Sequence, residues 1–212
     1  MLNVYEVAAK FYDAFSSERH VYRAGRESGV GLLALRAGDT VLDLGCGTGL
    51  NLPLLVDAVG PTGLVIGLDR SPQMLEMARR RVEENGWTTV RLIEADALTF
   101  DPVRVTKELP ASSGGQVDAV FSSYAMSVFD DWKPAWERVR ALLAPGGRAG
   151  IVDMQLPVGP ARVFSPLARL AAALGGSDLT ARPWTVLERD GVQVRSESVR
   201  GGHIQAVAAT IP

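Results

Sequence analysis

Between residues 40 and 153, short apolar runs alternate with segments of helical periodicity, and this alternation limits the fold more than any other feature of the chain. Helices are expected over 51–59, from the Ser71 cap to Gly86, and over 134–143. Strands that are apolar throughout and separated by amphipathic helices are typical of a parallel sheet buried on both faces. We therefore predict an α/β fold whose ligands bind beyond the carboxyl ends of the strands. The five expected strands are 40–44, 64–68, 90–93, 117–122 and 148–153.

The two ends of the chain depart from this alternation. The N-terminal part carries two helical patterns, over 4–15 and 21–35, and these predict a helical cover. Near the C-terminus, residues 192–199 and 204–211 alternate polar and apolar on either side of a glycine-containing turn. They predict a hairpin that adds an antiparallel strand at one edge of the sheet.

A second apolar segment, residues 161–174, contains Arg162 and Arg169. We expect it to form a helix that packs on the sheet. The alternative is an amphipathic helix on a membrane surface that serves a lipid-like acceptor, so peripheral contact with a membrane stays open. No apolar run reaches the roughly 18 residues of a membrane span.

Composition narrows the class of protein. The 212 residues are 47% hydrophobic with a formal net charge of −2, which excludes a wholly disordered chain and argues against nucleic-acid binding through bulk positive charge. Cys46 is the single cysteine, and with only His20 and His203 beside it a Cys/His zinc site is excluded. The first residues lack a signal-peptide pattern and no intrachain disulfide can form, so we expect a cytoplasmic protein.

Three alternate glycines follow the first expected strand, in the run VLDLGCGTGLN over 41–51. Glycines let the backbone turn tightly and approach a ligand, and the strand–turn–helix context makes them more informative than a glycine-rich loop alone. Asp69 ends the next strand, twenty residues after Gly49, where a carboxylate can accept hydrogen bonds from both hydroxyls of a ribose. After the third strand, the Asp96 carboxylate and the Ala97 N–H can bind the edge of an adenine.

As a set, these stretches resemble the class I S-adenosylmethionine-dependent methyltransferases. The matching runs, in family order over 40–153, are VLDLGCGTG, GLDRSPQML, EADAL, VDAVFSSYAMS and LLAPGGRAGIVD. The resemblance implies a Rossmann-like, doubly wound sheet of seven strands in the order 3-2-1-4-5-7-6, with strand 7 antiparallel. It also implies one methyltransferase domain over 1–212, made of a helical cover (1–39), a cofactor-binding core (40–154) and a C-terminal helix with an edge hairpin (155–212).

The same resemblance implies that the chain binds S-adenosylmethionine and releases S-adenosylhomocysteine. Asp43 and the glycine loop would face the methionine portion, Asp69 the ribose, and Asp96 the adenine. The implied cofactor-binding residues are Asp43, Gly45, Cys46, Gly47, Gly49, Asn51, Asp69, Arg70, Met74, Asp96, Ala97 and Ser122.

The acceptor is less constrained. Methyl transfer from a sulfonium is an in-line displacement in which positioning is the main catalytic resource, and a hydroxyl or C–H acceptor would also benefit from a base. Tyr124, His20 and Asp153 are candidate bases. We expect a small-molecule or lipid-like acceptor that reacts through N, O or C, without a metal, and the oligomeric state stays open. The N-terminal segment resembles the entry helices of ubiquinone/menaquinone and phospholipid-type methyltransferases. The candidate acceptor-site residues are Tyr12, Tyr22, Ser123 and Tyr124.

Three other functions stay open at this point. An NAD(P)-binding oxidoreductase shares the first glycine turn, but its G-x-G-x-x-G/A fingerprint needs Gly or Ala where this chain has Leu50. An aminopropyl transferase of related fold carries acidic residues after the fourth strand, where this chain has Ser122 and Ser123. A methyltransferase-like module could also bind the cofactor without turnover.

Overall fold

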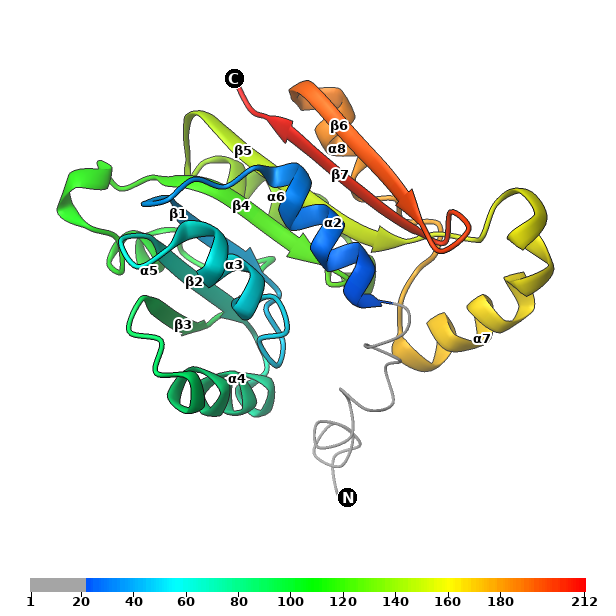
Figure 1. Ribbon diagram of the computed structural model, residues 1–212, viewed down its shortest axis with the longest axis horizontal. Coiled ribbons are helices and arrows are strands. Elements are labelled where there is room, and N and C mark those ends of the chain that lie inside the picture. Colours follow the sequence, from blue (N-terminus) through cyan, green and yellow to red (C-terminus); the bar gives the residue numbers. More distant parts are fainter. Residues whose placement is uncertain (1–21) are drawn as a thin grey trace.

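The computed structural model describes residues 22–212 and contains a seven-stranded sheet in the order β3-β2-β1-β4-β5-β7-β6 (Figure 1). β1 to β5 pair in parallel, and β7 is antiparallel to both of its neighbours, β5 and β6. This order and the antiparallel strand 7 confirm the fold class expected from the sequence. The strands are β1 Thr40–Leu44, β2 Leu64–Asp69, β3 Val90–Glu94, β4 Val117–Ser123, β5 Leu143–Met154, β6 Val192–Val199 and β7 Ile204–Thr210.

Helices cover both faces of the sheet. On one face, α2 and α3 contribute to a core with Val41 and Phe121, and on the other, α6 and α8 contribute to a core with Leu42 and Trp136. Adjacent strand residues such as Val41 and Leu42 therefore point into different cores, as expected for a parallel sheet buried on both sides. The helices are α2 Arg23–Leu33, α3 Leu52–Val59, α4 Pro72–Asn85, α5 Val103–Thr106, α6 Lys133–Arg140, α7 Ser165–Gly175 and α8 Thr185–Asp190, with short 3₁₀ turns η2 Ala111–Ser113, η3 Met126–Val128 and η4 Gly159–Phe164.

The structure differs from the sequence prediction in several elements, and the strand expected over 148–153 begins earlier, at Leu143. The helix expected over 134–143 ends at Arg140, because Leu143 already pairs with Val117 at the start of β5. β7 is buried along almost its whole length, although its sequence alternates, because it lies between β5 and β6. β6 forms the exposed edge. The apolar segment 161–174 is divided between η4 and α7.

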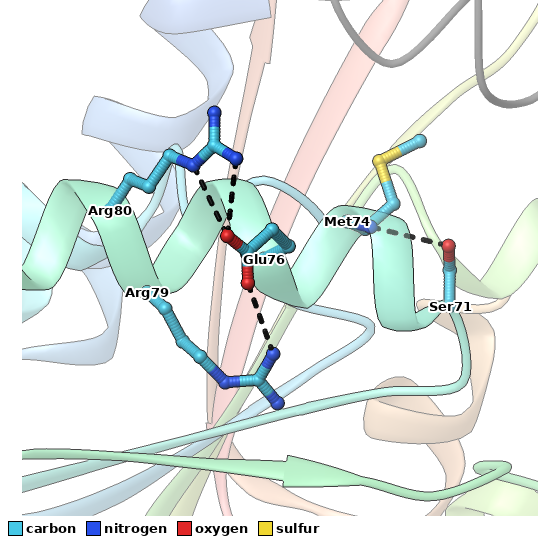
Figure 2. Close-up of polar contacts among 5 residues, drawn as sticks. All are labelled: Ser71, Met74, Glu76, Arg79 and Arg80. Atoms are coloured by element: carbon cyan, nitrogen blue, oxygen red, sulfur yellow. Dashed lines mark hydrogen bonds and ion pairs between the residues drawn. The ribbon is translucent and has the colours of Figure 1, made fainter.

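The start of α4 is fixed by local chemistry that the sequence predicts. The Ser71 hydroxyl accepts a hydrogen bond from the Met74 N–H at 3.3 Å, and Pro72 occupies the first helical position (Figure 2). Gly86 ends the helix with a φ of +64°. Figure 2 also shows Glu76 between Arg79 and Arg80 on the exposed face, where such pairs add little stability. The cap therefore sets where α4 begins, directly after the end of β2.

Two glycines let α2 lie close to the sheet. A Cβ on Gly25 would lie 2.1 Å from the Tyr124 hydroxyl and 2.7 Å from Cγ2 of Ile204. A Cβ on Gly29, one turn later, would lie 2.2 Å from Cγ2 of Val152. Since no side chain separates α2 from β5 and β7 at these positions, the helix sits low enough for its neighbouring residues to reach the ends of the strands (Figure 1).

We expect Gly29→Ala to destabilise the fold by about 1–3 kcal/mol, because the new methyl group would overlap the β-branched side chain of Val152. Gly31→Ala is the matched control on the same helix, because nothing lies within 4 Å of its Cβ position. That change should be neutral or stabilise by roughly 0.5–1 kcal/mol. Thermal unfolding followed by circular dichroism checks both variants, and equal melting temperatures would contradict the close packing of α2.

Candidate functional site

A pocket of about 290 Å³ lies at the carboxyl ends of β1, β2, β3 and β4. It extends from the residues after β3, past the glycine loop, to Tyr124 after β4. The pocket therefore occupies the edge of the sheet at which ligands of parallel α/β folds bind. Ten of the residues expected from the sequence line it: Gly45, Cys46, Gly47, Asp69, Arg70, Met74, Asp96, Ala97, Ser123 and Tyr124.

The glycine loop takes a backbone shape that only glycine adopts easily. Gly45, Gly47 and Gly49 have φ values of +72°, +55° and +80°. A Cβ on Gly45 would lie 2.4 Å from Cβ of Ala125, whereas a Cβ on Gly47 would meet no protein atom within 4 Å. Gly47 lines the pocket, so the loop presents bare backbone to whatever occupies that space. Gly49 packs against Leu52 and Ala78 and does not line the pocket.

The Asp69 carboxylate connects the glycine loop to the start of α4. Its Oδ2 accepts a hydrogen bond from the Gly47 N–H at 2.8 Å, and its Oδ1 accepts one from the Ser71 N–H at 2.9 Å. A carboxylate has about four acceptor positions, so two backbone bonds leave capacity for a ligand hydroxyl on each oxygen. Asp96 also lines the pocket, with its Oδ1 accepting from the Leu98 N–H at 2.8 Å.

Asp43 lies buried beneath the loop. Its Oδ1 accepts a hydrogen bond from Nδ2 of Asn51 at 2.7 Å, whereas its Oδ2, also buried, has no hydrogen-bond partner among the described residues. Burial raises the pKa of Asp43 to about 7, against the lowering effects of the Asn51 hydrogen bond and the charge of Arg26. Leaving a buried oxygen unpaired costs roughly 1–3 kcal/mol. Neither Asp43 nor Asn51, both expected from the sequence to bind the cofactor, lines the pocket itself.

Arg26, a residue that the sequence motifs did not indicate, also lines the pocket. Nη1 of Arg26, on α2, donates to Oδ1 of Asn51 at 2.9 Å and to Oγ of Ser123 at 2.5 Å. Its guanidinium carbon lies 4.9 Å from the ring centroid of Tyr124, a cation–π contact. Arg26 thus connects α2, α3 and β4 at one point. The available signal was the pair Gly25 and Gly29 within an expected helix, since small residues four apart indicate a close approach.

Tyr124 follows β4 in a left-handed conformation, with a φ of +55°. Its N–H donates to the Val152 carbonyl and its hydroxyl donates to the Tyr22 carbonyl, both at 2.8 Å. The rings of Tyr22 and Tyr124 meet edge to face with centroids 5.0 Å apart. The Tyr124 ring therefore lines the pocket while its hydroxyl is held by backbone, and Tyr22 supports it from outside the pocket lining.

Other predicted residues lie elsewhere. The Ser122 hydroxyl is buried and donates to the Leu44 carbonyl at 2.9 Å, so it connects β4 to β1 and does not line the pocket. Asp153 is also buried away from the pocket, where it accepts from the N–H and hydroxyl of Ser127 at 3.0 and 2.6 Å, and burial raises its pKa to about 6. Tyr12 and His20 lie outside the described residues. Within residues 22–212, no three His, Cys, Asp or Glu side chains gather as potential metal ligands.

Comparisons with known proteins agree with this geometry. A family model described as "Methyltransferase domain" matches residues 41–147. The chain is 35% identical over 145 residues to a demethylmenaquinone methyltransferase of Thermus thermophilus, covering 68% of this chain and 60% of that relative. It is 31% identical over 169 residues to a 2-phytyl-1,4-naphtoquinone methyltransferase of Synechococcus elongatus, covering 78% and 66%. This chain thus matches about 60% of the length of these relatives.

The fold is also found among solved structures. A SAM-dependent methyltransferase from Aquifex aeolicus superposes with a TM-score of 0.70 over 98% of both chains at 22% sequence identity. At that identity the likeness shows a shared fold, with the same arrangement of sheet and helices.

Proposed function

Because this chain belongs to the class I S-adenosylmethionine-dependent methyltransferases, we propose that it transfers a methyl group to a quinone-type small-molecule acceptor. The observation that carries the proposal is the pocket in which the glycine loop, Asp69 and Asp96 meet Arg26 and Tyr124. The acceptor class is supported by the names of the Thermus and Synechococcus relatives. The match to a methyltransferase domain also disfavours the oxidoreductase alternative.

S-adenosylmethionine supplies an electrophilic methyl group on a sulfonium. We propose that Asp69 accepts hydrogen bonds from the ribose hydroxyls, and that Asp96 with the Ala97 N–H binds the adenine. The methionine portion would lie against Gly45 and Gly47, where its ammonium group could satisfy the buried Oδ2 of Asp43. This assignment is supported by the unpaired oxygen of Asp43 and by the open space beside Gly47.

At the acceptor end, we propose that Arg26 has the main positioning role. It donates hydrogen bonds to Ser123 and Asn51 and stacks over the ring of Tyr124, so these side chains are held together on one side of the pocket. A planar ring acceptor would pack on Tyr124. A hydroxyl on the reduced, hydroquinone form of such a ring would lie in the positive field of Arg26. That field lowers the pKa of the hydroxyl, so that its proton passes to water and the nucleophilic oxyanion is favoured.

In the proposal, Arg26 takes the place of the two candidate bases that the structure describes, Tyr124 and Asp153, whereas the third, His20, lies outside the described residues. The Tyr124 hydroxyl donates to a backbone carbonyl, and Asp153 is buried away from the pocket, so neither is directed toward an acceptor. The reaction we propose therefore depends on orientation and on the charge of Arg26. A metal-free reaction is part of the same proposal.

The proposal predicts that S-adenosylhomocysteine stabilises the protein and that NAD does not. At a ligand concentration of 100 times Kd, binding contributes about 2.7 kcal/mol. For a chain of this size, this corresponds to an increase in Tm of roughly 5–11 °C. Thermal shift with both compounds checks the result, and stabilisation by NAD alone would overturn the assignment.

Turnover separates an enzyme from a module that only binds the cofactor. A panel of hydroxylated naphthalene and benzene rings, amines and thiols would be incubated with the protein and methyl-labelled S-adenosylmethionine. We expect label in the hydroxylated rings. Binding of S-adenosylhomocysteine with no transfer to any acceptor would favour the module without turnover.

Two further parts of the proposal concern organisation and location. We propose that residues 22–39 act as a cover over the core at 40–154, and that residues 155–212 complete its edge within the same domain. A cytoplasmic location and the absence of a nucleic-acid partner remain predictions from the composition.

A further inference from the structure

Large apolar side chains are exposed along α7, along η4 and at Val158 just before η4. Figure 1 shows α7 to one side of the sheet, apart from the helices that cover its two faces. We call this surface the α7 face. Its members are between 52% and 73% exposed. They are Val158, Val163, Phe164, Leu167 and Leu170.

α7 differs from an ordinary surface helix in which of its side chains face the protein and which face solvent. Among the side chains of α7 that the structure describes, the buried ones are those of Ala168 and Ala172, which pack in the cluster around Met154. Successive helical residues are about 100° apart, so Leu167 and Leu170 point away from the side of these two alanines. Surface helices normally bury their large apolar side chains. In α7 these side chains face outward, which indicates that a membrane or another protein surface covers them.

The charge of this segment indicates which kind of partner binds the α7 face. From Gln155 to Ser177 the sequence contains Arg162 and Arg169 and no Asp or Glu, although the whole chain has a formal net charge of −2. Both arginines are exposed. An exposed apolar face with basic residues beside it matches a membrane whose headgroups are anionic, since the leucines enter the acyl boundary while the guanidinium groups contact phosphate.

We propose that the α7 face binds the surface of an anionic lipid membrane. No helix among residues 22–212 is long and apolar enough to cross a bilayer, so the contact is with one leaflet. Gly175, the last residue of α7, lines the pocket. The proposal would therefore bring the pocket next to a source of lipid-soluble acceptor, a consequence that rests on the proposed function, whereas the membrane contact itself does not.

Vesicle flotation of the full chain tests the proposal without any turnover. Vesicles of phosphatidylcholine alone would be compared with vesicles that also contain phosphatidylglycerol. We expect the protein to float with the anionic vesicles. The double variant Leu167→Gln/Leu170→Gln should bind them at least ~10-fold more weakly, because two large apolar side chains are lost from the contact.

Two variants make the test specific. Val192→Gln/Val194→Gln, on the exposed edge strand β6, removes the same number of exposed apolar side chains far from α7 and should bind vesicles like the parent. Arg162→Gln/Arg169→Gln should lose binding several-fold on anionic vesicles. Circular dichroism would confirm that all three variants are folded.

Three outcomes would overturn the proposal. One is a full chain that floats with neither vesicle. Another is an equal loss of binding in the α7 and β6 variants. The third is a dimer in sedimentation velocity that Leu167→Gln/Leu170→Gln dissociates, which would assign the α7 face to a second copy of this chain. Because flotation needs no methyl acceptor, its failure leaves the proposed methyl transfer untouched.

Discussion

Asp69→Ala should weaken the binding of S-adenosylhomocysteine by roughly 10²–10⁴-fold. We propose that this carboxylate accepts two hydrogen bonds from the ribose, and hydrogen bonds to a charged group contribute about 1.5–3 kcal/mol each. The substitution also removes the acceptor of the Gly47 and Ser71 N–H groups, so the glycine loop loses its connection to α4. Isothermal titration calorimetry measures the change in Kd directly.

The matched control for Asp69→Ala is Asp57→Ala, which removes an exposed carboxylate from α3 and changes the net charge equally. Its Kd should equal that of the parent. A melting curve without ligand separates loss of binding from loss of fold. An Asp69→Ala protein that is folded and binds S-adenosylhomocysteine as the parent does would refute the assignment of this carboxylate to the ribose.

Arg26→Ala should lower kcat on the order of 100-fold while changing the Kd of S-adenosylhomocysteine much less. The reason is positional: Arg26 holds Ser123 and Asn51 and stacks on Tyr124, and a displacement of about 1 Å in these side chains can cost ~10²-fold in rate. Arg26→Lys keeps the charge but loses the planar guanidinium group, so its kcat should lie between that of the parent and that of Arg26→Ala. Steady-state kinetics with an acceptor found in the panel provides the measurement.

Arg23→Ala is the control on the same helix, because Arg23 is exposed and pairs with Glu27 on the surface one turn later, where such pairs contribute little. It should leave kcat unchanged. If Arg26→Ala instead abolishes binding of S-adenosylhomocysteine and leaves kcat intact at saturation, Arg26 belongs to the cofactor end of the pocket and our division of the site is wrong.

The sequence predicted the part of this pocket that contains Asp69 and Asp96, to which we assign the cofactor, because that part is built from local signals. Asp69 ends β2, Asp96 follows β3, and the Ser71 cap begins α4 two residues after Asp69. In a parallel sheet such residues meet at one edge, so strand order and motif spacing are enough to bring them together.

The position of Arg26 and Tyr124, to which we assign the acceptor, could not be predicted from the sequence in the same way. Arg26 reaches the pocket because Gly25 and Gly29 let α2 approach β5 and β7, strands that lie more than a hundred residues away in the sequence. The direction of a side chain is equally hidden: Ser122 and Ser123 are neighbours, yet one bonds the Leu44 carbonyl and the other lines the pocket. Alternation along a strand predicts opposite faces but not which face holds the ligand.

The packing of α2 also bears on the order in which the site is completed as the chain folds. The lining residues between Gly45 and Leu98 belong to elements joined by short crossovers, which can associate early. The position of Arg26 depends on α2 meeting strands at the far end of the chain, and the hydrogen bond from Ser28 to Glu197 spans 169 residues. On a ribosome, therefore, the part of the pocket between Gly45 and Leu98 can form during synthesis, whereas Arg26 takes its place only after β7 has emerged.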